Sequence, residues 1–354
     1  MLGREKVPVP MNRRQSLFGF ALLGAGALFR HRASACAWDS DTLRDESRLN
    51  GTDFDLITGQ FPHHGSAYYQ ARVKRLTAAG EPADYQSRND LAVAYLRLER
   101  WKESQALLDK NLRAKPGDYF TLSNLGVLAK KQGEYAKAAE WMAQAIAIKP
   151  EGHMGLGDWY VKSLQFRTEL AAHPKTVPDK NFLGIPYAGS FNPVYSAESL
   201  PPDSKPFLGM PFAEMREKLR RLLENDQSFS DGFLLMGDHL AASRDLSLAL
   251  LSYRRAALLG HSNRTELSRR ITTLNRELCE LGYDSNRTNY RTHMKAKRAD
   301  LEKLINKALT GAAEWLESFR KVEGEMVAKS GDENLTPEMV EAEMAKRGIK
   351  RYRP

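Results

Sequence analysis

The chain has few of the residues that staple small secreted proteins together. Cys36 and Cys279 are its two cysteines among 354 residues, so the sequence provides no disulfide framework. Cys279 lies in an apolar helical pattern and is most simply a small hydrophobic residue. Long hydrophobic runs are also missing, because the apolar stretch 17–29 is too short and too rich in glycine to predict a membrane span.

Recognised catalytic motifs are missing as well. The sequence has no His-Glu-x-x-His, Gly-x-Ser-x-Gly, Walker loop or Cys-x-x-Cys. His63 and His64 are adjacent, but no cluster of further ligands accompanies them, and such a pair in a loop is more often exposed to solvent. We therefore predict no catalytic residue, no cofactor and no metal site.

The positive charge is concentrated at the two ends. Of the formal net charge of +9, residues 1–35 contribute +5 and residues 264–354 contribute +4, which leaves residues 36–263 neutral. This distribution does not indicate a nucleic-acid partner. The basic tail 346–353 is expected to be solvated, with contact to anionic lipid as the alternative.

The N-terminus reads as an export signal. Arg13 and Arg14 precede the apolar run, and Ala33, Ser34 and Ala35 form a small-x-small cleavage pattern. The segment 1–35 is similar to a twin-arginine signal, although Ser16 replaces the usual bulky residue, and a general secretory signal is the alternative. The protein is expected to be periplasmic or secreted. It would be anchored to a membrane if Cys36, which follows the cleavage pattern, were lipidated.

A pattern of small and large apolar residues recurs with a period of about 34 residues. The paired positions are Leu91 and Leu125, Ala92 and Gly126, Tyr95 and Ala129, Leu108 and Met142, and Pro116 and Pro150. A third copy, further along the chain, contains Phe233, Met236, Gly237, Leu240, Ala249, Tyr253 and Ala256. Gly126 and Gly237 are expected where two helices approach most closely, with Ala138 and Ala249 opposite them.

This pattern resembles the tetratricopeptide repeat (TPR), in which two helices form a unit that must stack on its neighbours to bury its apolar face. The resemblance implies an all-α fold, a right-handed TPR helical-hairpin solenoid with one repeat split by an irregular insertion and a long C-terminal helix. The TPR array covers 85–263, with repeats at 85–118, 119–152 and 230–263. His261 stands in place of the closing proline of the last copy.

The split repeat covers 153–229, with expected helices at 155–171 and 212–224. Its insertion, at about 173–210, holds seven prolines and is followed directly by Pro211, and these prolines exclude a helix. Its aromatic residues argue against plain disorder, so the insertion either binds a partner or is pinned to the solenoid. These aromatics are Phe182, Tyr187, Phe191, Tyr195 and Phe207.

Helical segments are expected on both sides of the array. Residues 36–84 contain an acidic stretch and a capping helix at 65–80, and residues 264–285 form a second cap. The extension 286–354 contains a long helix over about 288–328, in which Gly311 is the expected point of interruption, and a short helix after Thr336 and Pro337.

The leading hypothesis is an exported adaptor that binds a protein or peptide of unknown identity in its concave groove and through the insertion. The resemblance implies that partner-binding residues lie on the exposed face of each first helix. Carried onto this sequence, they are Asn89, Val93, Arg97, Ser123, Val127, Lys130, Leu234 and Asp238. The alternatives are an accessory subunit or enzyme whose site is in the insertion, and a structural oligomer that pairs through the C-terminal helix.

Overall fold

Helices make up nearly all of the regular secondary structure in the computed structural model, which describes residues 51–187, 206–281, 298–332 and 335–353. The predicted signal 1–35, Cys36 and part of the predicted insertion lie outside the described residues. Within the ranges described, no helix is both long and apolar enough to cross a membrane.

Pairs of helices occupy the positions of the three repeat copies. The N-caps of the first two pairs are equivalent, because Asp84 accepts a hydrogen bond from Ser87 N and Asp118, one repeat period later, accepts one from Thr121 N. The all-α hairpin architecture predicted from the sequence is therefore confirmed. The pairs are α5 (Tyr85–Arg97) with α6 (Trp101–Ala114), α7 (Tyr119–Lys131) with α8 (Tyr135–Ile148), and α13 (Ser230–Ala242) with α14 (Leu246–Leu258).

Each pair turns through one residue with a left-handed backbone. Gly133 has a φ of 81° between α7 and α8, and the equivalent positions carry Glu99 with 62° and Arg244 with 63°. Glycine adopts this conformation without strain, whereas a residue with a Cβ does so at a cost. Gly133 in the second copy therefore occupies a turn position whose left-handed conformation all three copies share.

The predicted glycines lie at close helix approaches, but they differ in how crowded they are. A Cβ added at Gly126 would lie 3.3 Å from the Ala138 carbonyl oxygen, as the expected pairing requires. At Gly237 the nearest neighbour is the ring of Tyr253 rather than Ala249, and a Cβ would lie 2.3 Å from its Cε1 atom. The third pair is thus packed more tightly at this position.

The split repeat has helices on both sides of its insertion. The first helical part is α9 (Gly152–Gly155) followed by α10 (Gly157–Ala172), and the second is α12 (Phe212–Asn225). The insertion returns to α12 through a short antiparallel hairpin of β1 (Pro206–Phe207) and β2 (Met210–Pro211), in which Phe207 pairs with Met210.

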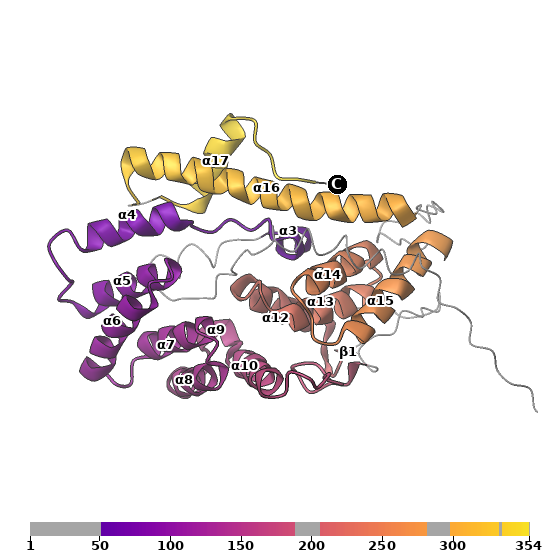
Figure 1. Ribbon diagram of the computed structural model, residues 1–354, viewed down its shortest axis with the longest axis horizontal. Coiled ribbons are helices and arrows are strands. Elements are labelled where there is room, and N and C mark those ends of the chain that lie inside the picture. Colours follow the sequence, from indigo (N-terminus) through magenta and orange to yellow (C-terminus); the bar gives the residue numbers. More distant parts are fainter. Residues whose placement is uncertain (1–50, 188–205, 282–297, 333–334, 354) are drawn as a thin grey trace, which may run out of the picture. The chain divides into compact units, whose positions relative to one another are not determined.

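The segments outside the repeats connect the first pair to the last. Helix α3 (Asp53–Thr58) packs on α12 and α14, whereas α4 (Ser66–Leu76) packs on α5. Helix α16 (Arg298–Ser330) runs beside both α3 and α4 and passes Gly311 without interruption (Figure 1). Beyond α14, the chain forms α15 (Arg264–Arg276) and a π-helical turn, η3 (Glu277–Leu281).

The basic tail is docked, which corrects the expectation of a solvated segment. After α17 (Pro337–Lys346), which Thr336 caps, Arg351 Nη1 lies 3.3 Å from the Asp55 carboxylate, and Arg353 also donates to that carboxylate. Tyr352 N donates to the Gln60 side chain at 2.7 Å. Asp55 of α3 thus pairs with two arginines of the tail, Arg351 and Arg353.

Candidate functional site

Four cationic side chains meet near the C-terminal ends of successive first helices. Arg97 ends α5, Lys130 and Lys131 end α7, and Arg167 lies in the last part of α10. Arg97 and Lys131 are separated by one repeat period and so occupy equivalent positions. We call these four residues, together with Asp226 at the end of α12, the cationic cluster.

Asp226 is the carboxylate around which the cluster is built. Its Oδ2 atom lies 3.0 Å from Lys130 Nζ and 2.8 Å from Arg167 Nη2, and all three side chains are largely buried. Its Oδ1 atom accepts a hydrogen bond of 2.6 Å from Ser228 Oγ. Burial alone would raise the pKa of Asp226, but Arg167 and Lys130 outweigh it and hold the pKa well below its usual range. The carboxylate is therefore ionised and fully engaged.

The cluster carries more positive than negative charge. Burial, and then repulsion from Lys130, Arg97 and Arg167, lower the pKa of Lys131 to about 8 against the attraction of Asp226. A concentration of partly buried cations around one carboxylate makes the binding of another carboxylate favourable. The arrangement is therefore suited to holding an acidic group.

A small pocket adjoins the cluster and has room for about one water molecule. Burial, and then the charge of Lys130, lower the pKa of His153 to about 4, so this histidine is neutral at neutral pH. Lys130 contributes the one ammonium group among the residues that line this pocket. The pocket is lined by Gly126, Val127, Lys130, Met142, His153, Tyr160 and Leu164.

The expected exposure of the predicted binding residues is wrong for most of them. Val93 and Val127 belong to the hydrophobic core between the first two pairs, and Leu234 is fully buried in the third. Arg97 and Lys130 retain partial exposure and lie in the cationic cluster. Of the eight, the structure thus brings together Arg97 and Lys130 beside Val127, which lines the pocket.

The polar residues among the predicted set are buried in packing contacts between helices. Asn124 Nδ2 donates to Asn89 Oδ1 at 2.8 Å, which joins α7 to α5. Ser123 donates to the Tyr119 carbonyl oxygen at 2.7 Å within its own helix. Asp238 is paired with Arg270 of α15. The helix face that the resemblance implied would be open is therefore covered by neighbouring helices at these positions.

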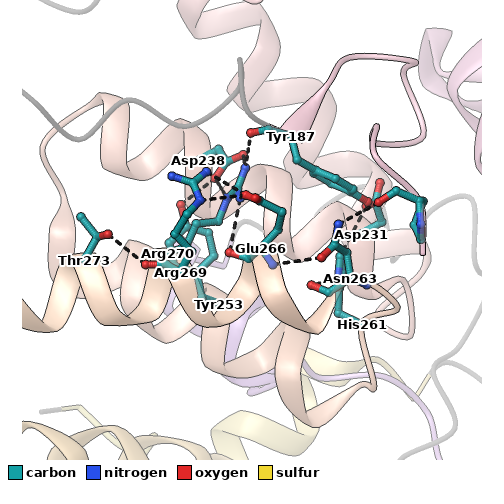
Figure 2. Close-up of polar contacts among 11 residues, drawn as sticks. Tyr187, Asp231, Asp238, Tyr253, His261, Asn263, Glu266, Arg269, Arg270 and Thr273 are labelled. Atoms are coloured by element: carbon teal, nitrogen blue, oxygen red, sulfur yellow. Dashed lines mark hydrogen bonds and ion pairs between the residues drawn. The ribbon is translucent and has the colours of Figure 1, made fainter. Parts of the chain in front are cut away.

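The insertion is fixed to the last repeat through Asp231. Tyr187 donates its hydroxyl hydrogen to Asp231 Oδ1 at 2.5 Å, and Phe182 N donates to Oδ2 at 2.9 Å (Figure 2). His261 Nε2 lies 3.2 Å from the same Oδ1 atom, and Asn263 Nδ2 donates to the Pro178 carbonyl oxygen at 2.7 Å. The histidine that replaces the closing proline of the repeat thus takes part in this anchor.

Three of the insertion aromatics are pins. Phe182 and Tyr187 are buried, and the Phe182 ring contacts Trp159 and Phe229 edge to face. Phe207 is buried at the other end, where its ring meets those of Phe212 and His239. The described parts of the insertion therefore match the expectation that its aromatics hold it to the solenoid. Phe191 and Tyr195 lie outside the described residues.

The adjacent histidines join the N-terminal segment to α16. His64 Nδ1 lies 2.6 Å from the Glu323 carboxylate, and the His64 ring stacks on Tyr68. Burial and the charge of Arg320 lower the pKa of His63 to about 3. Both residues are half-buried, which corrects the expectation of solvent exposure. Among the residues described, no group of three or more possible ligands is arranged to hold a metal ion.

Sequence reasoning missed three members of the cluster. One repeat period beyond Arg97 lies Lys131, whereas the predicted binding residue was its neighbour Lys130. Arg167 lies in the repeat that the insertion interrupts, where no intact copy fixes the register. Asp226 follows α12 and has no counterpart in the first-helix pattern. A strict repeat register would therefore have found one of the three.

Comparison with known families supports the repeat pattern. Residues 121–149, which cover most of α7 and α8, match the family model of the tetratricopeptide repeat. The chain contains a tetratricopeptide repeat. No curated protein and no solved structure matches the chain. The matched repeat carries Lys130 and Lys131 at the end of its first helix, so two of the five residues of the cationic cluster lie in the segment that the family model recognises.

Proposed function

We propose that this protein is an exported TPR scaffold whose groove of first helices binds an acidic segment of a partner protein. TPR domains generally bind protein partners, and the groove formed by their stacked pairs is a surface on which a peptide can lie. The observation that carries the proposal is the cationic cluster, in which Arg97, Lys130, Lys131 and Arg167 surround Asp226.

The chemistry of the cluster selects the kind of partner. Lys130 and Arg167 are paired with Asp226, and Lys131 and Arg97 are two further cationic side chains of the cluster. The latter two retain partial exposure, on first helices one repeat apart. Side-chain carboxylates or a C-terminal carboxylate would be favoured here, whereas a basic segment would be repelled. Export is part of the proposal because of the signal pattern in residues 1–35.

The test is direct binding of labelled peptides to the protein purified without residues 1–35. A fluorescent hexaglutamate peptide is compared with hexaserine and hexalysine peptides by fluorescence anisotropy at two salt concentrations. We expect the acidic peptide to bind, with affinity that falls as salt rises, and the other two not to bind. Equal binding of all three peptides, or of none, would refute the proposal.

Variants locate the binding to the cluster. Lys131→Gln removes a cluster cation without touching the contacts of Asp226, whereas Lys137→Gln removes an exposed lysine on α8. We expect the first to weaken hexaglutamate binding by about tenfold, the effect of roughly 1.4 kcal/mol, and the second to leave it unchanged. Equal affinities for the two variants would place the acidic site elsewhere.

A further inference from the structure

We propose that Asp55, Gln60 and the notch at Gly311 of α16 form a binding site for an arginine–aromatic–arginine segment of a partner protein. In this structure the chain's own basic tail occupies the site, and the partner binds by displacing it. We call Asp55, Gln60 and Gly311 the tail site. It shares no residue with the cationic cluster and does not rest on the acidic partner proposed above. The tail residues that occupy it are Arg351, Tyr352 and Arg353.

Gln60 holds the tail by its backbone. The Tyr352 N–H donates to Gln60 Oε1 at 2.7 Å, and Gln60 Nε2 donates to the Tyr352 carbonyl oxygen at 3.2 Å. One amide side chain thus pairs with both main-chain groups of a single residue, as a neighbouring antiparallel strand does. Gln60 is fully buried, and main-chain contacts of this kind provide affinity for an extended peptide. The tail is therefore bound in the manner of a peptide ligand.

The Tyr352 ring lies where α16 has a glycine. A Cβ added at Gly311 would lie 3.0 Å from the Cγ and Cδ2 atoms of this ring, so the missing side chain makes room for it. The centroid of the Phe54 ring lies 6.3 Å from that of Tyr352, and Lys307 Nζ lies 5.7 Å from the Tyr352 centroid. Aromatic and ammonium groups at such distances attract an aromatic ring. The notch therefore favours an aromatic residue over a small one.

Asp55 accepts the two arginines that flank the tyrosine. Arg353 Nη1 donates to Asp55 Oδ1, and its Nη2 donates to Oδ2 at 3.0 Å, which is a bidentate pair. Arg351 Nη1 lies 3.3 Å from Oδ2, and the Arg351 guanidinium carbon lies 5.0 Å from the centroid of the Trp315 ring. Lysine cannot form the bidentate pair, and it lacks the planar group that stacks on an aromatic face. The site therefore selects arginine at both positions.

The polar groups of the tail site are held in place by contacts that do not involve the tail. Thr52 N and Oγ1 donate to Asp55 Oδ2 at 3.0 and 2.8 Å, and Gln60 Nε2 donates to Asp55 Oδ1 at 3.0 Å. Gly59, with a φ of 78°, turns the chain between α3 and Gln60. Groups that are positioned before a ligand arrives lose little conformational freedom when it binds. The site is therefore suited to a second ligand with the same residues.

The tail is held by contacts that are open to solvent on one side. The side chain of Arg351 is 23% exposed and that of Arg353 is 47% exposed, and Lys350 just before them is exposed as well. Ion pairs of exposed groups contribute little free energy each. The tail gains its advantage from the tether, because a short connection gives an effective concentration of the order of millimolar. It therefore excludes weak ligands and yields to a partner segment that binds more tightly.

Peptide binding to the full chain with a released tail tests the site. The released-tail variant combines Arg351→Gln, Tyr352→Ala and Arg353→Gln. The control combines Lys346→Gln with Lys350→Gln, which removes as many positive charges from the same segment. Binding of a fluorescent Lys-Arg-Tyr-Arg-Pro peptide is measured by anisotropy. We expect the released-tail variant to bind it about tenfold more tightly than the parent and the control, because the tethered competitor is lost. Equal affinities in the three proteins, or no binding to the variant, would overturn the proposal.

Two glycine substitutions locate the bound peptide. In the released-tail variant, Gly311→Ala fills the notch, whereas Gly324→Ala on the same helix places a Cβ 3.6 Å from that of Ala67, an ordinary contact. Both changes raise helix propensity, so α16 should remain folded. We expect Gly311→Ala to weaken peptide binding about fivefold and Gly324→Ala to leave it unchanged. Equal affinities for the two would overturn the assignment of the ring to the notch.

Peptide selectivity and the size of the protein identify the occupant. Lys-Glu-Tyr-Glu-Pro and Lys-Arg-Gly-Arg-Pro peptides should bind the released-tail variant more weakly than the arginine–tyrosine peptide, and equal binding would overturn the selectivity. Light scattering should show that parent and variant have the same mass. A dimer formed by the parent alone would assign the site to the tail of a second copy and overturn the partner segment.

Folding of the variants is checked by circular dichroism and thermal melting. If the triple substitution prevents folding, Tyr352→Ala alone provides the test, because it retains both arginine pairs with Asp55 and removes the ring from the notch. We expect this single variant also to bind the arginine–tyrosine peptide more tightly than the parent. An affinity equal to that of the parent would overturn the proposal.

Discussion

Arg270 and Asp238 form an ion pair from which solvent is fully excluded. The Nε atom of Arg270 lies 2.7 Å from Oδ1 of Asp238, and both side chains are 0% exposed. Arg270 Nη2 also donates to the Tyr187 carbonyl oxygen at 2.8 Å, and the Tyr253 hydroxyl donates to Asp238 Oδ1 at 2.7 Å (Figure 2). One guanidinium group therefore joins the last repeat, the helix that follows it and the insertion.

Asp238→Asn should strongly destabilise the protein. The substitution removes the buried carboxylate that pairs with the buried guanidinium of Arg270. Removing one partner of a buried ion pair lowers the free energy of unfolding by on the order of 3–5 kcal/mol. Urea denaturation followed by circular dichroism measures the effect. Glu266→Gln is the control, because Glu266 also contacts Arg270 but is 25% exposed, and it should cost about 1 kcal/mol or less. Similar urea midpoints for the two variants would contradict the conclusion that the buried pair of Arg270 and Asp238 stabilises the fold.

Gly237→Ala should destabilise the protein more than Gly126→Ala. The added methyl group would lie 2.3 Å from the Tyr253 ring, which is fully buried and held by its hydrogen bond to Asp238. At Gly126 the closest contact is 3.3 Å, which small shifts can relieve. We expect Gly237→Ala to cost about 1–3 kcal/mol or more in the free energy of unfolding, because overpacking forces neighbouring groups to move.

Gly117 provides the control for these glycine substitutions. A Cβ at this position has no neighbour within 4 Å, so Gly117→Ala tests the general effect of removing a glycine. Its melting temperature should match or slightly exceed that of the parent. If all three variants melt together, close helix approach does not explain why glycine is needed at Gly237.

Acid should release the C-terminal tail. Burial alone would raise the pKa of Asp55, but hydrogen bonds from Arg353, Gln60 and Thr52 outweigh it and lower the pKa from 3.8 to about 2. Because the pKa is lower in the folded state, Asp55 stabilises the fold above about pH 4, and this contribution is lost as the pH falls from about 4 to 2. Its size is roughly 2 kcal/mol, at 1.36 kcal/mol per pKa unit.

The pH dependence of the melting temperature measures this contribution. Arg353→Gln removes the principal hydrogen bond that lowers the pKa of Asp55, so its melting temperature should fall less steeply between pH 4 and pH 2. Arg276→Gln, which removes an exposed pair with Glu277, serves as the control and should keep the slope of the parent. An unchanged slope in Arg353→Gln would show that the tail does not set the acid response.

Cleavage of the signal should leave a protein that begins near Cys36. The prediction follows from the paired arginines, the apolar run and the small residues at positions 33–35. Intact-mass measurement of the exported protein tests it, and a full-length N-terminus would contradict it. An added lipid mass on Cys36 would instead support the membrane-anchored alternative.

The repeat helices could be predicted because their determinants are local. Small residues such as Gly126, the N-caps Asp84 and Asp118, and the turn glycine Gly133 each recur or act within one repeat unit. The hairpin architecture depends on these residues, so the periodicity was sufficient to assign the all-α fold. Residue exposure is a different matter, because it depends on what packs against the unit.

The contacts that cover the groove and dock the tail could not be predicted, because they depend on segments that pack against the repeat unit from outside it. Asp238 reads as a surface residue until Arg270, from the helix beyond the last repeat, is placed against it. Asp55 and Arg353 lie at opposite ends of the described chain, and no periodicity relates them. Within the candidate site, Arg97 and Lys130 followed from the repeat, whereas Asp226 became a member through the fold of the interrupted unit.

The packing of α3 on α14 has a consequence for the order of synthesis. Repeat arrays usually fold from neighbour to neighbour and can begin to do so while the chain is being made. Here α3 and α4 emerge early, but α14, α16 and the tail that cover them emerge late. The apolar side chains at the beginning of the array must therefore remain uncovered until translation is nearly finished.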